Sequence, residues 1–409
     1  MKICDVVQFY SPLSGGVKRY IHDKMRYLSS VDGVEHVVVV PSHHNYDEVV
    51  EGSRIYHIQS LPLVGSRSYR MLLSRHRIEE IAEWEQPDII EVGDPYRSAW
   101  IALAVARRYG IPVVAYYHSD YPRALGRTIR RFAGPRLQKA VARPINAYLY
   151  RLYARMDATV VATGRMERIL RELGVPRLVR VPLGTNVDVF RPMPSRENLL
   201  HALRLPPATR LLLYVGRLAR EKNIKALLDM MPLLDDVPDV HLLMVGDGEQ
   251  ARKVRHQARL HARLSWLPYC GTPEDLAKLY SAAELLVHAG TGETFGLAAL
   301  EAQACGTRAI GVRNGGLDDA LTGEEPLIMA DTADPADLAA AVRQALLLEE
   351  PADAPQRRRE RVAANFSSER TYQRMLALYR RLRDAGPLVP AGISNEECTD
   401  VLYHPSVCS

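Results

Sequence analysis

Long apolar runs are absent from this chain. Its 409 residues are 47% hydrophobic, yet no stretch approaches the ~18 consecutive apolar residues that a membrane-spanning helix needs. We also expect no signal peptide, because Lys2–Tyr10 already forms a predicted β-strand. With 25% charged residues, the composition favours a soluble globular protein.

Cysteine is scarce and odd in number. Five cysteines in a chain of this length do not form the framework of a disulfide-stabilised secreted protein. We therefore expect a reducing, cytoplasmic setting. Cys4, Cys270 and Cys305 lie in apolar stretches and are expected in the core, whereas Cys398 and Cys408 lie in the C-terminal tail.

Acidic residues are missing from one long segment. The net charge of the chain is only +5, but residues 121–156 contain nine basic residues and no Asp or Glu. Apolar side chains alternate with the charges, and Pro135 and Pro144 can each begin a helix. The basic residues are Arg123, Arg127, Arg130, Arg131, Arg136, Lys139, Arg143, Arg151 and Arg155.

A basic amphipathic helix of this kind indicates contact with an anionic membrane surface, where each Lys or Arg contributes ~1 kcal/mol. A solvated helix face, or a rim that steers an anionic ligand, would have the same composition. Both interpretations stay open from the sequence. Nucleic acid is disfavoured, because the segment lacks aromatic platforms and a helix-turn-helix pattern.

The chain is too long for one typical core, so we expect two domains. Short apolar strands alternate with helical stretches in both halves, which predicts parallel, doubly wound α/β sheets. Residues 184–207, rich in Pro and polar side chains, separate the halves. Expected strands cover 3–9, 36–41, 54–58, 88–91, 112–117, 158–162, 178–181, 211–215, 241–245, 264–267, 285–288, 307–312 and 326–329, and expected helices cover 17–29, 74–83, 98–109, 144–155 and 166–173.

Two carboxylates eight positions apart form the most informative motif. The apolar run Glu284–His288 predicts a buried strand, so Glu293 falls in a strand-to-helix loop, where open α/β sheets bind ligands. The first free amides of the next helix, near Phe295–Leu297, favour an anion. Glu301 lies about two turns along that helix and needs hydroxyl donors, which a ribose or a hexose supplies. The motif therefore predicts a nucleotide-sugar site.

A second cluster supports this interpretation. Arg217 and Lys222 leave the loop that follows the strand at 211–215. Two cations at the carboxyl end of a strand suit a diphosphate, because the Arg guanidinium can form two parallel hydrogen bonds and the Lys ammonium is a compact charge.

Together these motifs resemble the retaining glycosyltransferases of the two-Rossmann (GT-B) type, in the large bacterial group that includes mannosyl- and glucosyltransferases. The resemblance spans residues 1 to about 380, and its pieces stand in the family's order. Each piece is common alone, but the set is specific. The pieces are Ser14-Gly15-Gly16-Val17, Tyr117-His118, Val181 through Asp188, Gly216-Arg217 with Lys222, Val245 through Gly248, and Glu293 through Gly306.

The resemblance implies roles for two residues of the first half. Gly16 would let the backbone approach a phosphate. His118 would contact the donor sugar, and we do not assign it as a general base. Asp120 is a nearby candidate with weaker support.

In the second half, the resemblance implies that Arg217 and Lys222 meet the charge of the diphosphate. Glu293 would hold the donor sugar or its neighbourhood, and Glu301 the ribose hydroxyls. The expected catalytic set is His118, Arg217, Lys222 and Glu293. Backbone amides near the sugar and distal phosphate would come from Thr294, Phe295, Gly296 and Leu297.

The resemblance also implies how the chain divides. Residues 1–184 would form a Rossmann-like domain on the acceptor side, and residues 185–367 a Rossmann-like domain for the nucleotide sugar, the two facing a central cleft. Residues 368–386 would form a helix that crosses back to the first domain. We expect residues 387–409 to be a loose tail.

The segment Val245–Ala251 fits the dinucleotide pattern G-x-G-x-x-A after a strand. It stands at the second strand of its domain, whereas that fingerprint belongs at the first, and no acidic residue ends a strand about twenty positions further on. A dehydrogenase is therefore disfavoured. By resemblance, this loop borders the nucleotide site.

No Asp-x-Asp pair occurs in the chain, although such a pair is the usual means by which a transferase ties Mg²⁺ to a diphosphate. We expect His43-His44 to be a loop pair rather than a ligand set. Arg217, Lys222 and helix N-termini would then meet the charge of the leaving group. We predict no metal and no cofactor besides the nucleotide sugar that serves as substrate.

Three positions depart from the family pattern. Where a Pro-Ser pair is common before the first glutamate, this chain has the stretch His288–Gly292. Thr307 replaces a usual Pro, and Ser368 replaces an aromatic residue at the start of the crossing helix. The first two departures would reshape the donor pocket, and the third concerns the domain crossover.

We therefore predict a cytoplasmic, retaining, metal-independent hexosyltransferase, peripheral on the inner face of the plasma membrane if the basic segment binds lipid. It would move a hexose from a nucleotide diphosphate sugar to a hydroxyl of a glycan, a lipid or a small molecule, with domain closure before chemistry. GDP-mannose, UDP-glucose and UDP-galactose all fit, and the start Phe9–Gly16 resembles mannosyltransferases.

Two alternatives stay open. A related enzyme such as an epimerase would act on the nucleotide sugar without transfer, but it would need an extra acid/base pair that the chain does not show. A non-catalytic protein that binds a nucleotide sugar or a membrane is the other alternative. The intact set of two cations and two glutamates argues against it.

Overall fold

The computed structural model describes residues 1–10, 16–63, 69–268 and 271–388, and of residues 124–125 and 127–140 only the backbone. Several sequence predictions fall outside this part of the chain. They are the Ser14-Gly15 turn, the core position of Cys270, the tail from residue 389 with Cys398 and Cys408, and the basic side chains from Arg127 to Lys139.

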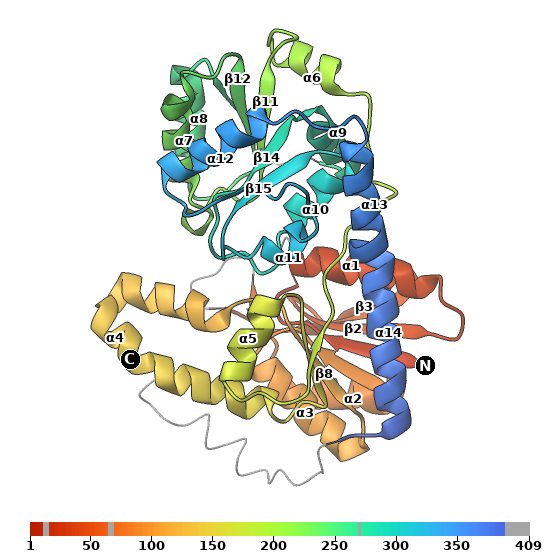
Figure 1. Ribbon diagram of the computed structural model, residues 1–409. Coiled ribbons are helices and arrows are strands. Elements are labelled where there is room, and N and C mark those ends of the chain that lie inside the picture. The colour runs from red at the N-terminus through yellow and green to blue at the C-terminus, as the bar shows by residue number, and fades with distance from the viewer. Residues whose placement is uncertain (11–15, 64–68, 269–270, 389–409) are drawn as a thin grey trace. The chain divides into compact units, whose positions relative to one another are not determined.

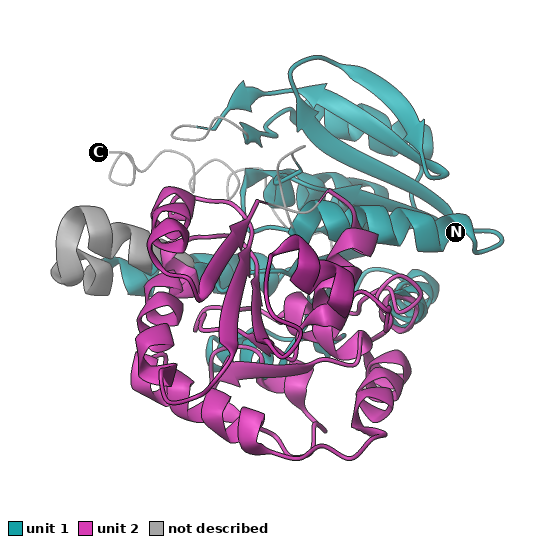
Figure 2. Cartoon of the chain, turned by 90° about the horizontal axis from the view of Figure 1, so that it is seen from above, with its two compact units in different colours: residues 1–181, 372–409 teal, residues 182–371 magenta. Residues whose placement is uncertain are grey.

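The chain forms two compact units (Figure 2). Unit 1 comprises residues 1–181 and 372–409, and unit 2 comprises residues 182–371. Each unit has its own sheet, mostly parallel in unit 1 and fully parallel in unit 2, and its own helices (Figure 1), which confirms the predicted α/β class with two Rossmann-like parts. The last helix, α14 (Ser368–Ala385), is shared: its first four residues belong to unit 2 and the rest to unit 1.

The sheet of unit 1 has the order β10-β9-β8-β7-β1-β2-β4-β3 and is parallel except at β3. The sequence did not predict β3, because its side chains are exposed along the strand and leave no apolar pattern. The strands are β1 (Lys2–Val6), β2 (Glu35–Ser42), β3 (Tyr46–Val50), β4 (Ser53–Gln59), β7 (Ile89–Val92), β8 (Val113–Tyr117), β9 (Ala158–Val161) and β10 (Leu178–Arg180), beside a small hairpin of β5 (Leu61–Pro62) and β6 (Arg70–Met71).

One helix of unit 1 differs from its prediction. The sequence predicted helices that begin at Pro135 and Pro144, but α4 runs unbroken over Tyr121–Tyr153. Its start is fixed by Asp120, whose carboxylate accepts the Arg123 N–H at 3.1 Å, so both prolines lie inside the helix. Over its full length the apolar residues of α4 do not gather on one side. The other helices are α1 (Gly16–Ser29), α2 (Arg75–Glu85), α3 (Arg97–Tyr109) and α5 (Gly164–Glu172).

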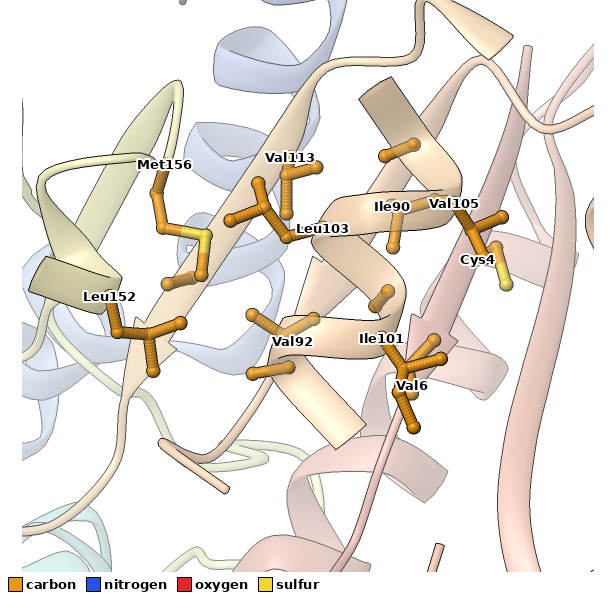
Figure 3. Close-up of a cluster of buried hydrophobic side chains, with 14 of the residues drawn as sticks. Cys4, Val6, Ile90, Val92, Ile101, Leu103, Val105, Val113, Leu152 and Met156 are labelled. Carbon is orange, nitrogen blue, oxygen red and sulfur yellow. The ribbon is translucent and has the colours of Figure 1, made fainter. Parts of the chain in front are cut away.

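A core cluster of unit 1 lies between its sheet and the helices α2, α3, α4 and α5, and Figure 3 shows part of it around α3. Cys4 and Val6 of β1 and Ile90 and Val92 of β7 point to one face of the sheet because side chains alternate along a strand. The apolar residues of α3 cover them, and the buried position predicted for Cys4 is confirmed.

A buried charge cluster holds α14 on unit 1. Lys24 Nζ lies 2.7 Å from Asp5 Oδ1 and 3.1 Å from Glu91 Oε2. The Lys24 ammonium also donates to the Tyr379 hydroxyl at 2.9 Å, and that hydroxyl donates to Glu91. All four side chains are buried, so each charge needs its partners.

The sheet of unit 2 has the order β13-β12-β11-β14-β15-β16 and is parallel throughout. Helix α7 packs with α12, whereas α10 packs with both α9 and α13. The strands are β11 (Arg210–Val215), β12 (Val240–Val245), β13 (Leu264–Leu267), β14 (Leu285–Val287), β15 (Arg308–Val312) and β16 (Met329–Ala330). The helices are α6 (Arg196–Ala202), the 3₁₀ turns η1 (Arg220–Lys222) and η2 (Met231–Leu234), α7 (Ile224–Met230), α8 (Ala251–Leu260), α9 (Pro273–Ala282), α10 (Leu297–Ala304), α11 (Asp318–Leu321), α12 (Pro335–Leu347) and α13 (Ala354–Phe366).

Candidate functional site

The strand order of unit 2 places a topological switch point at the centre of its sheet. Strands β11 and β14 are neighbours, with Leu212 opposite Leu285. From β11 the chain leads to β12 on one side, and from β14 it leads to β15 on the other. The loops after β11 and β14 therefore diverge, and such a switch point is where open α/β sheets bind ligands.

At this point Lys222 and Glu293 meet. The Lys222 ammonium forms an ion pair with Glu293 Oε1, and His288 Nε2 lies 3.1 Å from the same oxygen. Burial favours the neutral acid, but the Lys222 charge and the His288 hydrogen bond outweigh it and hold the pKa of Glu293 well below its usual range. Glu293 is therefore an ionised carboxylate at neutral pH.

The structure does not bring Arg217 to this pair. Its side chain is 68% exposed, and its Nη2 lies 2.6 Å from Glu221 Oε1. The backbone around it is fixed, because the buried Tyr214 hydroxyl donates to the Arg217 carbonyl at 3.0 Å. The two predicted cations thus share one loop but have different partners in this structure.

Glu301 lies inside α10 and is buried. Its Oε2 accepts a hydrogen bond from the Tyr280 hydroxyl of α9 at 2.8 Å. A buried carboxylate needs such donors; the sequence predicted ligand hydroxyls in this role, whereas the structure shows a tyrosine of the protein. Tyr280 could not be identified from the sequence, since the two residues meet only through the packing of α9 on α10.

The turn that leads into α10 is tightly packed. Gly296 precedes the helix with φ +89°, a left-handed conformation that favours glycine. Phe295 is buried, its ring 6.1 Å from that of Phe366. The Glu293 N–H donates to the Gly315 carbonyl at 3.1 Å, and a Cβ on Gly316 would lie 1.9 Å from the Glu293 carbonyl oxygen. The loop with Glu293 is therefore held closely on the turn after β15.

The glycines of the G-x-G-x-x-A segment have a packing role. A Cβ on Gly246 would lie 2.0 Å from the Gly216 carbonyl oxygen, and one on Gly248 would lie 2.6 Å from that of Leu218. The Leu218 N–H donates to the Asp247 carbonyl at 2.8 Å. These contacts brace the loop that carries Arg217 and Lys222, so the glycine pattern has an explanation without a dinucleotide.

The remaining site candidates, Gly16 and His118, lie in unit 1. Gly16 begins α1, and a Cβ there would meet no atom within 4 Å. The His118 ring stacks on Tyr116 with the ring centres 4.3 Å apart. Burial, assisted by the nearby Lys24 charge, lowers the pKa of His118 to about 3. Its imidazole is therefore neutral at physiological pH.

His118 borders a hollow of about 200 Å³. Asp94, which the sequence analysis did not single out, borders it too. Its carboxylate accepts the Gln8 N–H at 3.0 Å and a hydrogen bond from the Ser98 hydroxyl at 3.1 Å, so it ties the segment after β1 to the start of α3. Burial raises the pKa of Asp94 to about 6. The described residues around the hollow are Val7, Phe9, Val17, Tyr69, Gly93, Asp94, His118, Ser119 and Tyr121.

Asp120 has structural partners. Besides capping α4, its Oδ2 lies 3.3 Å from Arg165 Nη2. Within the described ranges, no group of three or more His, Cys, Asp or Glu side chains is placed to hold a metal ion. In the same part of the chain, no helix combines the length and the apolar character needed to cross a membrane.

Comparisons with known proteins give the class of the chain. The model of the family Glycosyl transferases group 1 matches residues 195–363, and that of Glycosyltransferase Family 4 matches residues 14–189. The sequence is 28% identical over 387 residues to a GDP-mannose-dependent alpha-(1-6)-phosphatidylinositol dimannoside mannosyltransferase of Mycobacterium tuberculosis, covering 92% of this chain and 94% of that protein. It is 29% identical to a glycogen synthase of the same species, covering 95% and 98%.

Solved structures share the fold. Sucrose-phosphate synthase from Thermosynechococcus elongatus superposes with a TM-score of 0.74 at 24% identity, over 94% of this chain and 99% of that chain. HepE of Anabaena in complex with UDP-glucose gives a TM-score of 0.71 at 17% identity, over 93% and 100%. The fold and the two family matches together show that the chain belongs to the GT-B glycosyltransferases.

Proposed function

We propose that this glycosyltransferase is a retaining hexosyltransferase that uses a nucleotide diphosphate sugar. The observation that carries the proposal is the meeting of Lys222 and an ionised Glu293 at the switch point of unit 2, beside the start of α10. A cation, a carboxylate and free helix amides at one point suit a sugar joined to a diphosphate.

Each group has a role in this proposal. Glu293 accepts hydroxyls of the transferred sugar, and Glu301 accepts those of the ribose. Lys222, the exposed Arg217 and the amides from Thr294 to Leu297 stabilise the negative charge that develops on the leaving diphosphate. In attack from the same face, the leaving phosphate takes the proton of the acceptor hydroxyl, so no protein base is required. A neutral His118 fits a role in hydrogen bonding rather than proton removal.

Because these charged groups meet the leaving-group charge, we also propose a reaction without a metal ion. EDTA should leave turnover unchanged. Loss of turnover with EDTA that Mg²⁺ or Mn²⁺ restores would contradict this part of the proposal.

The relatives favour GDP-mannose as the donor. The mannosyltransferase named above is GDP-mannose-dependent and matches along nearly the whole chain, whereas the structure with UDP-glucose is only 17% identical. We therefore rank GDP-mannose first and UDP-hexoses second.

The charge of unit 1 suggests an acceptor at an anionic lipid surface. Unit 1 has 31 Lys and Arg against 22 Asp and Glu, a net charge of +9, whereas unit 2 has 22 against 26, a net charge of −4. Residues 121–156 alone contribute nine positive charges and no negative ones, so the rest of unit 1 is balanced. We propose that this segment, α4 with its flanks, places the enzyme on the cytoplasmic face of a membrane, where a lipid or lipid-linked glycan accepts the sugar.

The test is the release of nucleoside diphosphate from GDP-mannose, UDP-glucose, UDP-galactose and an ADP-sugar, with and without vesicles that contain anionic lipid. We expect slow hydrolysis of one donor and acceleration by vesicles that falls with added salt. Lys222→Ala and Glu293→Ala should each lose activity about 100-fold or more while remaining folded. Lys225→Ala, an exposed lysine paired with Asp229, is the matched control.

Other outcomes point to the alternatives. Donor binding without release of diphosphate, in the folded protein and in Glu293→Ala alike, indicates the non-catalytic binder. An altered sugar still joined to its nucleotide indicates the epimerase. Equal rates with anionic and neutral vesicles contradict the role of α4.

A further inference from the structure

His288 begins the stretch His288–Gly292, in which the resembling family commonly has a Pro-Ser pair, and no role was assigned to it from the sequence. It directly follows β14 and is buried within the site of unit 2. We propose that His288 is a positioning residue that keeps the Glu293 carboxylate in place when Lys222 turns from that carboxylate to the diphosphate of the donor. The inference rests on the proposed function and adds a residue to its site.

The imidazole of His288 is fixed in one tautomer. The Gly290 N–H donates to His288 Nδ1 at 3.2 Å, so Nδ1 has its lone pair there. The proton is then on Nε2, which lies 3.1 Å from Glu293 Oε1 and donates to it. The ring thus connects the backbone after β14 to the carboxylate five residues further along the chain.

The surroundings leave this ring little freedom. The His288 N–H donates to the Ile310 carbonyl of β15 at 2.9 Å. A Cβ on Gly290 would lie 2.6 Å from His288 Cε1, so only glycine permits the turn to close over the ring. The Tyr214 ring lies on the β11 side, with its centre 5.9 Å from that of His288. The site is therefore built to hold the Nε2 proton toward Glu293.

The need for such a group follows from the charges. Glu293 Oε1 has both Lys222 and His288 as partners. A diphosphate is more negative than a carboxylate and competes with Glu293 for Lys222. When Lys222 moves, the largely buried carboxylate would lose its cation, and an unpaired buried charge is costly. The Nε2–H of His288 remains and lowers that cost, so the exchange becomes easier and Glu293 stays aimed at the sugar.

Two substitutions separate the two hydrogen bonds of the ring. His288→Gln can place an N–H near the position of Nε2 and keep the bond to Glu293. His288→Asn can place an oxygen near Nδ1, which keeps the bond from Gly290 and removes the donor to Glu293. We expect His288→Asn to lower kcat/KM for GDP-mannose about 10- to 100-fold, the size of one hydrogen bond to a charged group, with much of the loss in KM. His288→Gln should retain activity within a few-fold.

Affinity for GDP and UDP is measured by calorimetry beside turnover. Nucleotide affinity should follow the same order as turnover, with weaker binding by His288→Asn than by His288→Gln. Without a donor at the position of Nε2, Glu293 retains Lys222 as its partner, and Lys222 is less available to the diphosphate. His241→Gln is the matched control, since His241 is also buried in unit 2 and its Nε2 bonds to the Ser265 hydroxyl at 2.9 Å. Its effect should be confined to thermal stability.

Two results would overturn the inference: a folded His288→Asn with unchanged kcat/KM and nucleotide affinity, or equal losses in the Asn and Gln variants that track their melting temperatures. The second result would make His288 a packing residue only. Failure of the proposed function looks different, because the unchanged protein would then release no diphosphate from any donor.

Discussion

At the scale of single residues, the site depends on which charges meet. The sequence predicted that Lys222, Glu293 and Glu301 belong to one site, because their spacing around strands and helix starts is a local property. The structure brings Lys222 to Glu293 and leaves Arg217 with Glu221. Which carboxylate each cation pairs with depends on how two loops approach each other in the folded protein. Local patterns in the sequence do not show that approach.

Buried histidines make the protein sensitive to acid. Burial lowers the pKa of His118 to about 3, with a further contribution from Lys24, and that of His241 to about 4, with a further contribution from Arg263. The ordinary histidine pKa is about 6.5, so the unfolded chain takes up protons first as the pH falls. The contribution of these neutral histidines to the free energy of unfolding should therefore be full above about pH 6.5. It should decline below that pH, by up to ~1.4 kcal/mol for each unit of pKa difference.

The measurement is the melting temperature of the protein and of His241→Gln between pH 7.5 and pH 4.5. The variant should lose less stability than the unchanged protein over that range. His76→Gln is the control, because the His76 side chain is 81% exposed. Parallel curves for the protein and His241→Gln would contradict the assignment.

The buried lysine of unit 1 gives a second prediction at this scale. Lys24→Met leaves Asp5 and Glu91 without their cation, and breaking a buried ion pair costs about 3–5 kcal/mol. Arg26→Met on the same helix removes an exposed cation and should cost at most about 1 kcal/mol. Urea unfolding of both variants measures the difference, and similar losses would show that the cluster does not stabilise unit 1.

At the scale of elements, strand and helix positions were predictable where apolar residues are periodic. Most predicted strands in the cores of both sheets agree with the structure to within a few residues. The exposed strand β3 was missed because it has no buried face. Helix α4 was divided wrongly at Pro135 and Pro144, because proline was taken as a helix start although Asp120 caps the helix further upstream.

Close loop packing at the carboxyl end of β12 gives the third prediction. Gly246→Ala places a Cβ 2.0 Å from the Gly216 carbonyl oxygen and requires φ +143°, so the loop with Arg217 and Lys222 must shift. We expect a loss of about 1–3 kcal/mol in stability and a higher KM for the donor. Gly271→Ala is the control, because its Cβ would meet no atom within 4 Å. Thermal melting and donor kinetics measure both variants, and equal behaviour would contradict this packing role.

At the scale of the whole molecule, the chain builds unit 1, then unit 2, and returns to unit 1 through α14. Tyr372 and Tyr379 of this helix are buried in unit 1, where Tyr379 joins the cluster around Lys24. Helix α14 therefore packs into the same unit as the first strand of the chain, β1.

Ending the chain at Thr371 tests this dependence. The shortened protein retains all of unit 2 but lacks the part of α14 that belongs to unit 1. Hydrogen exchange should show strong loss of amide protection in β1 and β7, while β11 and β14 remain protected. Equal loss in both units would contradict the division, and no loss would show that α14 is dispensable for unit 1.

The sequence by itself determined the fold class, because apolar periodicity, glycine positions and helix starts are properties of neighbouring residues. It also predicted Lys222, Glu293 and Glu301 as the main charged residues of the site. It also determined the excess of positive charge in residues 121–156. Only the tertiary structure decided that His288 and Tyr280 are partners of the two glutamates and that Tyr379 closes the cluster around Lys24. Each of these pairs joins separate elements, whose meeting depends on strand order and helix packing rather than on local sequence.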